Sequence, residues 1–330
     1  MPYNSLIDRT DAGALIPEEV SREIIQGVVS RSVVLNMARR LPNMASGQQK
    51  VPVLSALPSA YFVSGDTGLK QTSEAAWQNK YLVAEEIAVI VPIPEAVLDD
   101  ANYDIWGEIR PRIEEAFGQA IDQAVLLGTN IPSSWNTNMD GAGVLGAAPS
   151  AHKVDLSVEE DNGKDLYDVI LGEGGLFGLV EEDGFRVTGA VAALSMRSKL
   201  RGLREKVYNG TTLVSLGAPL FTTSMQEANR YLLDGVPIEF PGNNAVDPAS
   251  ALMFVGDWSN LVYSIRQDVT YKVLTEAVIT DNTNAIIYNL AQQDMVALRA
   301  VMRLGVALPN PATKANPNAS TRFPFAVLVP

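Results

Sequence analysis

The sequence predicts an α+β fold, and three stretches carry that prediction. Residues 104–128 place an apolar side chain at every fourth position, as one face of a long amphipathic helix does. Residues 80–91 and 294–307 alternate between two faces, which is the pattern of β-strands. The apolar positions of the helix are Ile105, Ile109, Ile113, Phe117, Ile121 and Val125.

The composition describes a chain that can bury a sizeable core. Hydrophobic residues make up 47% of the 330 residues, which suits one large domain or a few smaller ones. Trp106 and Trp258 are predicted as core aromatics. No apolar run is long enough to span a membrane, and the N-terminus lacks the pattern of a secretory signal. The absence of cysteine excludes disulfides and thiol chemistry. We therefore expect folding in a cytoplasm and no membrane partner.

The N-terminal part predicts an arm, a helix and a long hairpin. Residues 1–14 are polar, and the proline and acids within 15–19 open a helix that we expect to end near Arg39-Arg40. Pro92 and Pro94 are expected to end the hairpin's last strand. Such a hairpin has little core of its own, so it is either an exposed flap or reaches a partner. Its predicted segments are strands over 50–54, 60–64 and 80–91, around a polar tip over 65–74.

The helix over 104–128 would be roughly 37 Å long, enough to cross a domain. Asp104 suits its N-cap, and Gly128 suits its end. Pro111 conflicts with a regular helix, so the helix either begins nearer Ile109 or is kinked in its second turn.

The C-terminal part mixes helices and strands without an internal repeat. We expect helices over 164–180 and 195–207, although three glycines weaken the first. Loops are predicted over 130–151 and 309–322. The predicted strands are 190–194, two within 231–240, 252–258, 261–265, 269–273, 294–307 and 323–329.

No stretch carries the residues of a catalytic, cofactor or metal site. The only histidine, His152, is predicted in a solvated polar loop, which is too little for a hydrolytic triad or a metal centre. Adjacent acids such as those at 181–183 do not automatically converge and indicate solvated faces. Residues 141–146 match G-x-G-x-x-G, but a polar loop precedes them and Ala-Ala-Pro follows, so we expect a flexible loop. We predict no enzyme activity and no cofactor.

One basic cluster lies in a chain whose formal net charge is −13. Its positions are Arg197, Lys199, Arg201, Arg204 and Lys206, all on the helix predicted over 195–207. Arg197, Arg201 and Arg204 share a face, which is either solvated or an electrostatic contact with a neighbouring subunit or an acidic partner. The acidic balance of the whole chain should repel nucleic acid, apart from any local basic patch.

Six local phrases, in order, carry a resemblance to a known family. They are IVPIPEAVLDD at 90–100, QAVLLGTN at 123–130, LDGVPI at 233–238, VGDWS at 255–259, VYSIRQDVT at 262–270 and MVALRAVMRLG at 295–305. With the order of the predicted elements, they resemble the major capsid proteins of tailed bacteriophages, which have the Hong Kong 97-type fold. The resemblance covers about residues 15–308.

The resemblance implies a domain organisation. Residues 1–46 would form an N-arm, and residues 47–91 an extended loop (the E-loop) that overlies a neighbouring subunit. Residues 92–150 and 262–322 would form a peripheral domain around the spine helix over 104–128. Residues 151–261 would form an axial domain, which the closing strand over 323–330 is expected to rejoin.

The resemblance also implies a function. The chain would self-assemble as hexamers and pentamers into an icosahedral shell, assembled in the host cytoplasm, that encloses double-stranded DNA without sequence-specific contact. Because the chain reaches its arm directly from Met1, we expect a separate scaffolding protein, with a portal and decoration proteins as further partners. The expected interface residues are Lys70, Gln71, Trp77, Lys80, Arg197, Arg201 and Arg204.

Alternatives and one family feature complete the expectations. Some relatives form Lys–Asn crosslinks between subunits, but no motif pairs Lys70 or Lys80 with Asn310 or Asn316, so we expect none. An encapsulin-like bacterial shell would share the fold and hold protein cargo. A small-molecule enzyme would need converging polar groups that the sequence does not show.

Overall fold

The structure is a computed structural model that describes residues 32–63, 68–70, 72–100, 104–135, 137, 139, 141–208, 213–219 and 231–330. Of these, residues 204–208, 213–219 and 231 are described as backbone. The predicted N-terminal arm, most of the first predicted helix and Gln71 lie outside the described residues.

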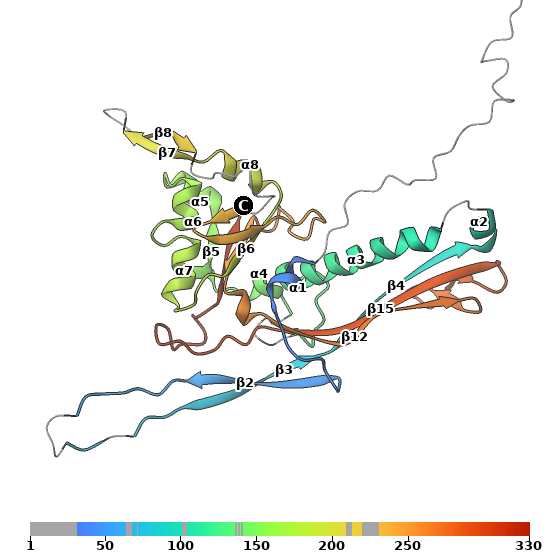
Figure 1. Cartoon of the computed structure of the whole chain (residues 1–330), viewed down its shortest axis with the longest axis horizontal. Helices are drawn as coiled ribbons and strands as arrows, with labels where there is room; N and C mark the ends of the chain where they lie inside the picture. Colours follow the sequence, from blue (N-terminus) through green and yellow to red (C-terminus); the bar gives the residue numbers. More distant parts are fainter. Residues whose placement is uncertain are drawn as a thin grey trace, which may run out of the picture.

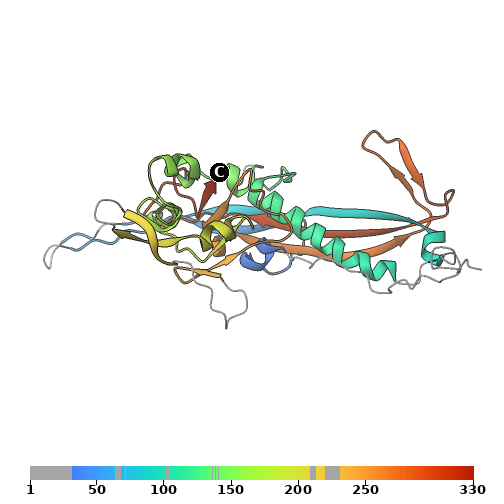
Figure 2. The same cartoon turned by 90° about the horizontal axis from the view of Figure 1, so that it is seen from above.

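The long helix α3 (Ile105–Leu127) lies along a four-stranded sheet (Figures 1 and 2). Its apolar stripe, with Phe117 and Val125, shares one core with Leu304 of the sheet. The helix prediction is confirmed, and Pro111 lies inside the helix, so a later start is wrong. The strand order is β1 (Arg39–Arg40), β12 (Val262–Leu274), β15 (Met295–Ala307) and β4 (Glu85–Pro94).

The alternation over 80–91 belongs to two strands rather than one. The hairpin of β2 (Gln48–Ala56) and β3 (Ala76–Val83) ends at Val83, and Ala84 separates it from β4. β4 pairs antiparallel with β15 over its whole length and runs through Pro92 to Pro94, so these prolines do not stop it earlier. Prolines are tolerated there because β4 is an edge strand.

A six-stranded sheet forms the second body, with short helices around it (Figure 1). Its order is β5 (Lys153–Asp155), β16 (Phe325–Val329), β11 (Met253–Gly256), β6 (Gly189–Ala192), β10 (Val236–Glu239) and β9 (Tyr231–Leu233). The helices are α5 (Leu156–Asp161), α6 (Leu166–Leu171), α7 (Leu176–Glu182) and α8 (Met196–Arg201). The closing strand β16 lies between β5 and β11 in this sheet.

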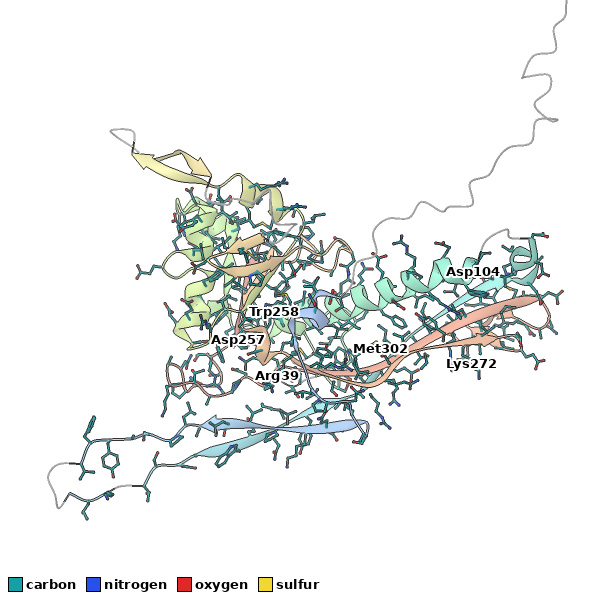
Figure 3. All side chains as sticks on the ribbon, in the orientation of Figure 1. Arg39, Asp104, Asp257, Trp258, Lys272 and Met302 are labelled. Atoms are coloured by element: carbon teal, nitrogen blue, oxygen red, sulfur yellow. The ribbon has the colours of Figure 1, made fainter. Side chains whose placement is uncertain are left out.

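The middle strands of the six-stranded sheet face two different cores. Phe254 of β11 and Phe325 of β16 belong to the core that contains α3, whereas Val255 and Ala326 belong to the core under α6 and α7. Successive residues of a strand point to opposite faces, so one sheet closes both cores. Trp258 joins the first core, donates from Nε1 to the Gly189 oxygen at 3.0 Å, and meets Phe325 edge-to-face (Figure 3).

Several predicted helices are shorter in the structure. The segment over 172–175, which contains three glycines, divides the predicted 164–180 helix into α6 and α7. The helix predicted over 195–207 ends at Arg201, and β7 (Arg204–Tyr208) then pairs with β8 (Leu213–Pro219). The first helix, α1 (Val33–Met37), ends before Arg39, because Arg39-Arg40 pairs with β12 as β1.

Two further elements differ from the expectations. The described part of the segment predicted as a strand over 60–64 has no strand. The sequence did not suggest a hairpin of β13 (Val278–Thr280) and β14 (Ile286–Asn289), which projects beside the far end of β15 (Figure 2). The short helix α2 (Glu95–Asp100) lies between β4 and the spine helix.

The prediction of a flexible loop over 141–146 is wrong, because most of this glycine-rich stretch is helical. From Gly143 onward it forms α4 (Gly143–Ala147), which packs on the end of α3. Gly128 and Gly143 both have positive φ, and their backbones meet so closely that a Cβ on Gly128 would lie 2.4 Å from the Ala142 oxygen. Only glycine allows this approach, which closes the C-terminal end of the spine helix.

We expect Gly128→Ala to lower the free energy of unfolding by at least roughly 3 kcal/mol, because it combines left-handed strain with a backbone clash. Gly141→Ala is the matched control, since Gly141 has φ 67° but no atom within 4 Å of its added Cβ. It should cost only the strain, about 1 kcal/mol. Urea unfolding of the unassembled chains measures both, and equal losses would contradict the packing argument.

Candidate subunit interfaces

The hairpin of β2 and β3 extends away from the two sheets of the body (Figure 1). Its register runs from Gln48 opposite Val83 to Leu54 opposite Trp77. Beyond the strands, Ser59 and Ser73 keep the two chains together, with the Ser59 nitrogen donating to the Ser73 hydroxyl at 2.7 Å. This bond joins the two sides of the hairpin beyond the ends of its strands.

The base of the hairpin is fastened to the four-stranded sheet. A small core of its own joins Leu82 with Met44 and Ala307. Trp135 Nε1 donates to the Val83 oxygen at 3.0 Å, and Thr137 Oγ1 donates to the Tyr81 oxygen at 2.8 Å. These contacts set the angle at which the hairpin leaves the body.

The middle of the hairpin rests on the loop over 309–322. The Ala312 nitrogen donates to the Leu54 oxygen at 2.9 Å, and Lys314 Nζ donates to the Pro58 oxygen. This loop connects β15 to β16, so the hairpin is supported by both bodies of the fold. The direction of the hairpin therefore depends on the contacts that hold this loop in place.

A buried polar cluster around Asp183 holds that loop. The Asp183 carboxylate accepts from Asn316 Nδ2 and from the Phe323 nitrogen, both at 2.7 Å. Arg322 is buried beside it and donates to the oxygens of Asn310 and Asn316 at 2.9–3.1 Å. Buried donors that lose such partners cost free energy, so these bonds fix the loop's path.

His152 belongs to this cluster, which corrects the prediction of a solvated loop histidine. It ends the short helix η1 (Ser150–His152), is 4% exposed, and places Nε2 3.0 Å from the Asp183 carboxylate. Burial lowers its pKa, although the charges of Asp183 and Glu182 act in the opposite direction. Asp183 is itself 7% exposed, so the expectation that the acids at 181–183 are all solvated is also wrong.

A second buried carboxylate fastens the described start of the chain to the spine helix. Asp122 of α3 is fully buried and accepts from Ser32 Oγ at 2.6 Å, from the Val33 nitrogen at 2.9 Å and from the Val34 nitrogen at 3.0 Å. It therefore caps the first turn of α1 from a neighbouring helix. Burial raises the pKa of Asp122 to about 6, and these hydrogen bonds, with a further one from Asn243, partly oppose that rise.

The expected interface residues on the hairpin have exposed or half-buried side chains. Lys70 is exposed near the tip, and Trp77 of β3 is 68% exposed. Lys80 is half-buried opposite Val51 of β2. Gln71 lies outside the described residues.

The expected arginines do not form one helical face. Arg197 is half-buried on α8, and exposed Arg201 donates from Nε to the Arg197 oxygen at 3.2 Å. Arg204 begins β7 instead of continuing the helix. α8 lies across the six-stranded body from the hairpin, so the structure separates the two groups of candidates (Figure 1).

In the part of the chain that the structure describes, no group of three or more histidine and acidic side chains is placed to hold a metal ion. None of the described helices is both long enough and apolar enough to cross a membrane.

Comparison with known proteins identifies the family. The model of the phage capsid family matches residues 12–313. The chain belongs to the phage capsid family. Two relatives are the major capsid protein of Staphylococcus phage 80alpha and the probable major capsid protein gp17 of Mycobacterium phage D29. Each is 25% identical, over 92% and 87% of this chain and over 85% and 84% of the relative.

Solved structures agree with this family over nearly the whole chain. One from Microbacterium phage Oxtober96 is 34% identical, with a TM-score of 0.76, and the match covers 99% of this chain and 100% of that chain. One from Mycobacterium phage Adephagia is 29% identical, with a TM-score of 0.75, over 99% and 98%. The protein is a major capsid protein of the tailed-phage type with the Hong Kong 97-type fold, and the encapsulin-like alternative is not favoured.

The phage capsid family is a family of structural proteins, and its members are found in the virion capsid. The sequence did not single out the residues that orient the elements of this capsid subunit. Asp122 lies next to Ile121 of the apolar stripe of the helix. An acid at the edge of such a stripe was the one sequence signal for a buried, hydrogen-bonded carboxylate. Asp183 and His152 lie far apart in the sequence, and nothing local indicates that they meet.

The unfolding free energy of the unassembled chain should fall as the pH rises from about 4 to above 6, by roughly 3 kcal/mol through Asp122. With a pKa raised from 3.8 to about 6, the folded chain keeps a proton that the unfolded chain has released. Asp122→Asn should abolish this contribution, while its Oδ1 can still accept from Ser32 and Val34.

Urea unfolding of both chains at about pH 4 and about pH 7 measures the effect. Titration of His152 is common to both chains and cancels in the difference between them. A difference that stays constant with pH would contradict the assignment to Asp122.

Proposed function

We propose that this capsid protein self-assembles as hexamers and pentamers into an icosahedral shell around the double-stranded DNA of a tailed phage. The observation that carries the proposal is the hairpin of β2 and β3. It is fastened at its base but exposes large apolar side chains such as Phe62 and Trp77. A hairpin on its own cannot bury these side chains and so gains no free energy from them. A neighbouring subunit could cover them, as exposed apolar patches often mark protein–protein contacts.

The proposed domains follow the two bodies of the fold. Residues 1–46 serve as the N-arm, and residues 151–261 with the closing strand over 323–330 form the axial domain. Residues 92–150 and 262–322 form the peripheral domain around the spine. Support for an E-loop boundary at Ala84, rather than at residue 91, comes from the pairing of β4 with β15.

The proposed subunit contacts are of two kinds. On the E-loop, Trp77 supplies apolar area, and Lys70, Gln71 and Lys80 supply polar rim contacts, in line with the usual anatomy of interfaces. On the axial domain, Arg197, Arg201 and Arg204 supply positive charge, which would meet an acidic surface of another copy in a chain of net charge −13.

Further partners are proposed with the shell. They are a separate scaffolding protein, a portal and decoration proteins, with assembly in the host cytoplasm. The net negative charge supports a shell that confines DNA without sequence-specific contact, since close phosphate binding needs many basic side chains. No catalytic role and no covalent Lys–Asn crosslink are proposed.

Negative-stain electron microscopy tests assembly, with absorbance at about 260 and 280 nm recorded on the same fractions. Closed shells, or rings of five and six, are expected from the purified chain or after addition of a scaffolding protein. Nucleic acid inside shells from virions is expected. Shells that hold an enzyme instead would revive the encapsulin-like reading, and a chain that stays monomeric would overturn the proposal.

Trp77→Ser should raise the protein concentration needed for assembly by at least about fivefold, because it removes an aromatic anchor from the E-loop. The stability of the unassembled chain should change by less than about 0.5 kcal/mol, since the side chain is 68% exposed. Trp77→Phe is the matched control and should assemble nearly as the wild type does. Light scattering over a concentration series measures assembly, and an unchanged threshold for Trp77→Ser would exclude this residue from the interface.

A further inference from the structure

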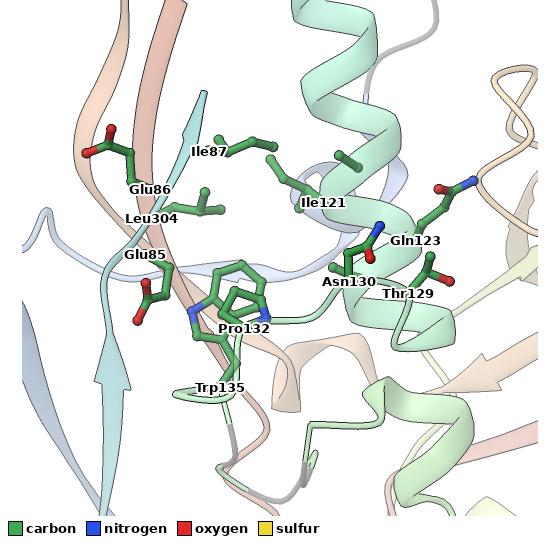
Figure 4. A pocket seen from close by; sticks show the side chains of 12 residues that line it. Glu85, Glu86, Ile87, Ile121, Gln123, Thr129, Asn130, Pro132, Trp135 and Leu304 are labelled. Atoms are coloured by element: carbon green, nitrogen blue, oxygen red, sulfur yellow. The ribbon is translucent and has the colours of Figure 1, made fainter. Parts of the chain in front are cut away.

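A pocket of about 220 Å³ lies between the C-terminal half of the spine helix and the start of β4 (Figure 4). Its walls come from β4, β15, α3 and the loop that follows α3. Drug-sized ligands occupy roughly 300–1,000 Å³, whereas one water molecule takes about 30 Å³ of the liquid. The pocket therefore suits a molecule below drug size, of about ten non-hydrogen atoms.

The strand register turns one carboxylate of β4 toward the spine helix. Glu85 lies directly opposite Leu304 of β15, and directly opposite residues of an antiparallel pair share a face of the sheet. Leu304 is buried in the core that contains α3, so Glu85 points to that side as well. Glu86 also borders the pocket, but it pairs with Arg303 and its side chain belongs to the other face (Figure 4).

The Glu85 carboxylate has no cationic partner among the described residues. It is half-buried, and one of its oxygens accepts from Ser134 Oγ at 2.5 Å. None of the ion pairs in the described part of the chain includes Glu85. An ammonium group in the pocket would donate a charge-assisted hydrogen bond to the second oxygen of this carboxylate.

The end of the spine helix adds a second negative feature. α3 ends at Leu127, and the next residues but one, Thr129 and Asn130, line the pocket. The C-terminal end of a helix carries a partial negative charge, which a basic side chain in the last turn can offset. The last turn of α3 has no basic residue. The helix end and the carboxylate therefore both favour a cation.

The remaining wall of the pocket is apolar. Ile87 and Ile121 face each other across it, and Trp135 lies at the other end (Figure 4). Trp135 Nε1 donates to the Val83 oxygen at 3.0 Å, two residues before Glu85, so this bond holds the ring at the carboxylate end. An aromatic ring attracts a cation, while the isoleucines favour carbon over water. A positive charge on an apolar body matches this combination, and a hydrated inorganic cation does not.

We propose that this pocket is a binding site for a small organic ammonium ion, with one protonated amine on an apolar body. The ammonium group lies against Glu85, and the apolar body lies between Ile87 and Ile121. A bound ion joins β4 to the spine helix and so holds the sheet and the helix together. The inference goes beyond the proposed assembly and does not depend on it, because the site lies within one chain.

Calorimetric titration of the unassembled chain with 2-phenylethylamine at neutral pH tests the site. One molecule per chain should bind saturably, at least about tenfold more tightly than the uncharged 2-phenylethanol, because only the amine pairs with Glu85. Methylammonium, which lacks the apolar body, should also bind at least about tenfold more weakly. Equal binding of the amine and the alcohol, or no saturable binding of the amine, would overturn the proposal.

Glu85→Gln should weaken binding of the amine by at least about tenfold and leave binding of the alcohol unchanged, because its amide oxygen can still accept from Ser134. Glu86→Gln is the matched control. It removes the same charge from the other face of the sheet and should weaken binding by less than about twofold. Equal losses from the two variants would contradict the placement of the ammonium group.

Filling the pocket should block the amine. Ala120 lines the pocket from an exposed position on α3, so Ala120→Phe should abolish binding. Ala116→Phe is the matched control, since Ala116 is exposed about one turn earlier on α3 and does not line the pocket. It should bind as the wild type does, and full binding by Ala120→Phe would place the amine elsewhere and overturn the site.

Urea unfolding gives a second readout on the same chains. Amine at ten times its Kd should lower the unfolding constant of the wild type and of Ala116→Phe by about elevenfold, and that of Ala120→Phe should not change. Titration of assembled shells then extends the test. Retained binding would support the site in the capsid, whereas loss on assembly would show that a neighbouring subunit closes the pocket and would overturn the site there.

Discussion

The arrangement of the molecule depends on one sheet that closes two hydrophobic cores. Phe254 and Phe325 point toward the spine helix, and their neighbours Val255 and Ala326 point toward α6 and α7. Because both faces of β11 and β16 are buried, neither core can shift without disturbing the other. The four-stranded sheet, the spine helix and the base of the β2–β3 hairpin are thereby held at a fixed angle to the six-stranded body.

Sequence patterns predicted the elements whose periodicity is local. The spine helix, β15 and the closing strand were all visible because one stripe or one alternation runs through each of them. The alternation could not show that the chain leaves one sheet and enters another at Ala84. The same two-residue period runs through β3 and β4 without a break. It also could not show that Arg39-Arg40 pairs with β12, because that choice depends on a strand more than two hundred residues away.

The site was less predictable than the fold. Exposed candidates such as Trp77 could be chosen by residue type, but the residues that aim the E-loop are polar side chains joined across the sequence. Asp122 accepts hydrogen bonds from Ser32, Val33 and Val34, and Asp183 accepts from Asn316 and Phe323 and lies 3.0 Å from His152 Nε2. Buried acids of this kind are retained where distant segments supply such partners. Their titrations also act oppositely, because burial raises the pKa of Asp122 and lowers that of His152. Proton uptake therefore favours the Asp122 junction and burdens the His152 junction.

The two prolines of β4 have a consequence for how such a protein avoids fibres. β4 is the outer strand of the long sheet, and a free outer strand can recruit a strand from another molecule. Pro92 and Pro94 have no N–H to offer to an added strand. Open-ended stacking of sheets is thereby discouraged at the high concentrations that precede shell formation. Assembly of the shell then depends at this edge on side-chain contacts, which are reversible. Reversible contacts allow misplaced subunits to dissociate before the shell closes.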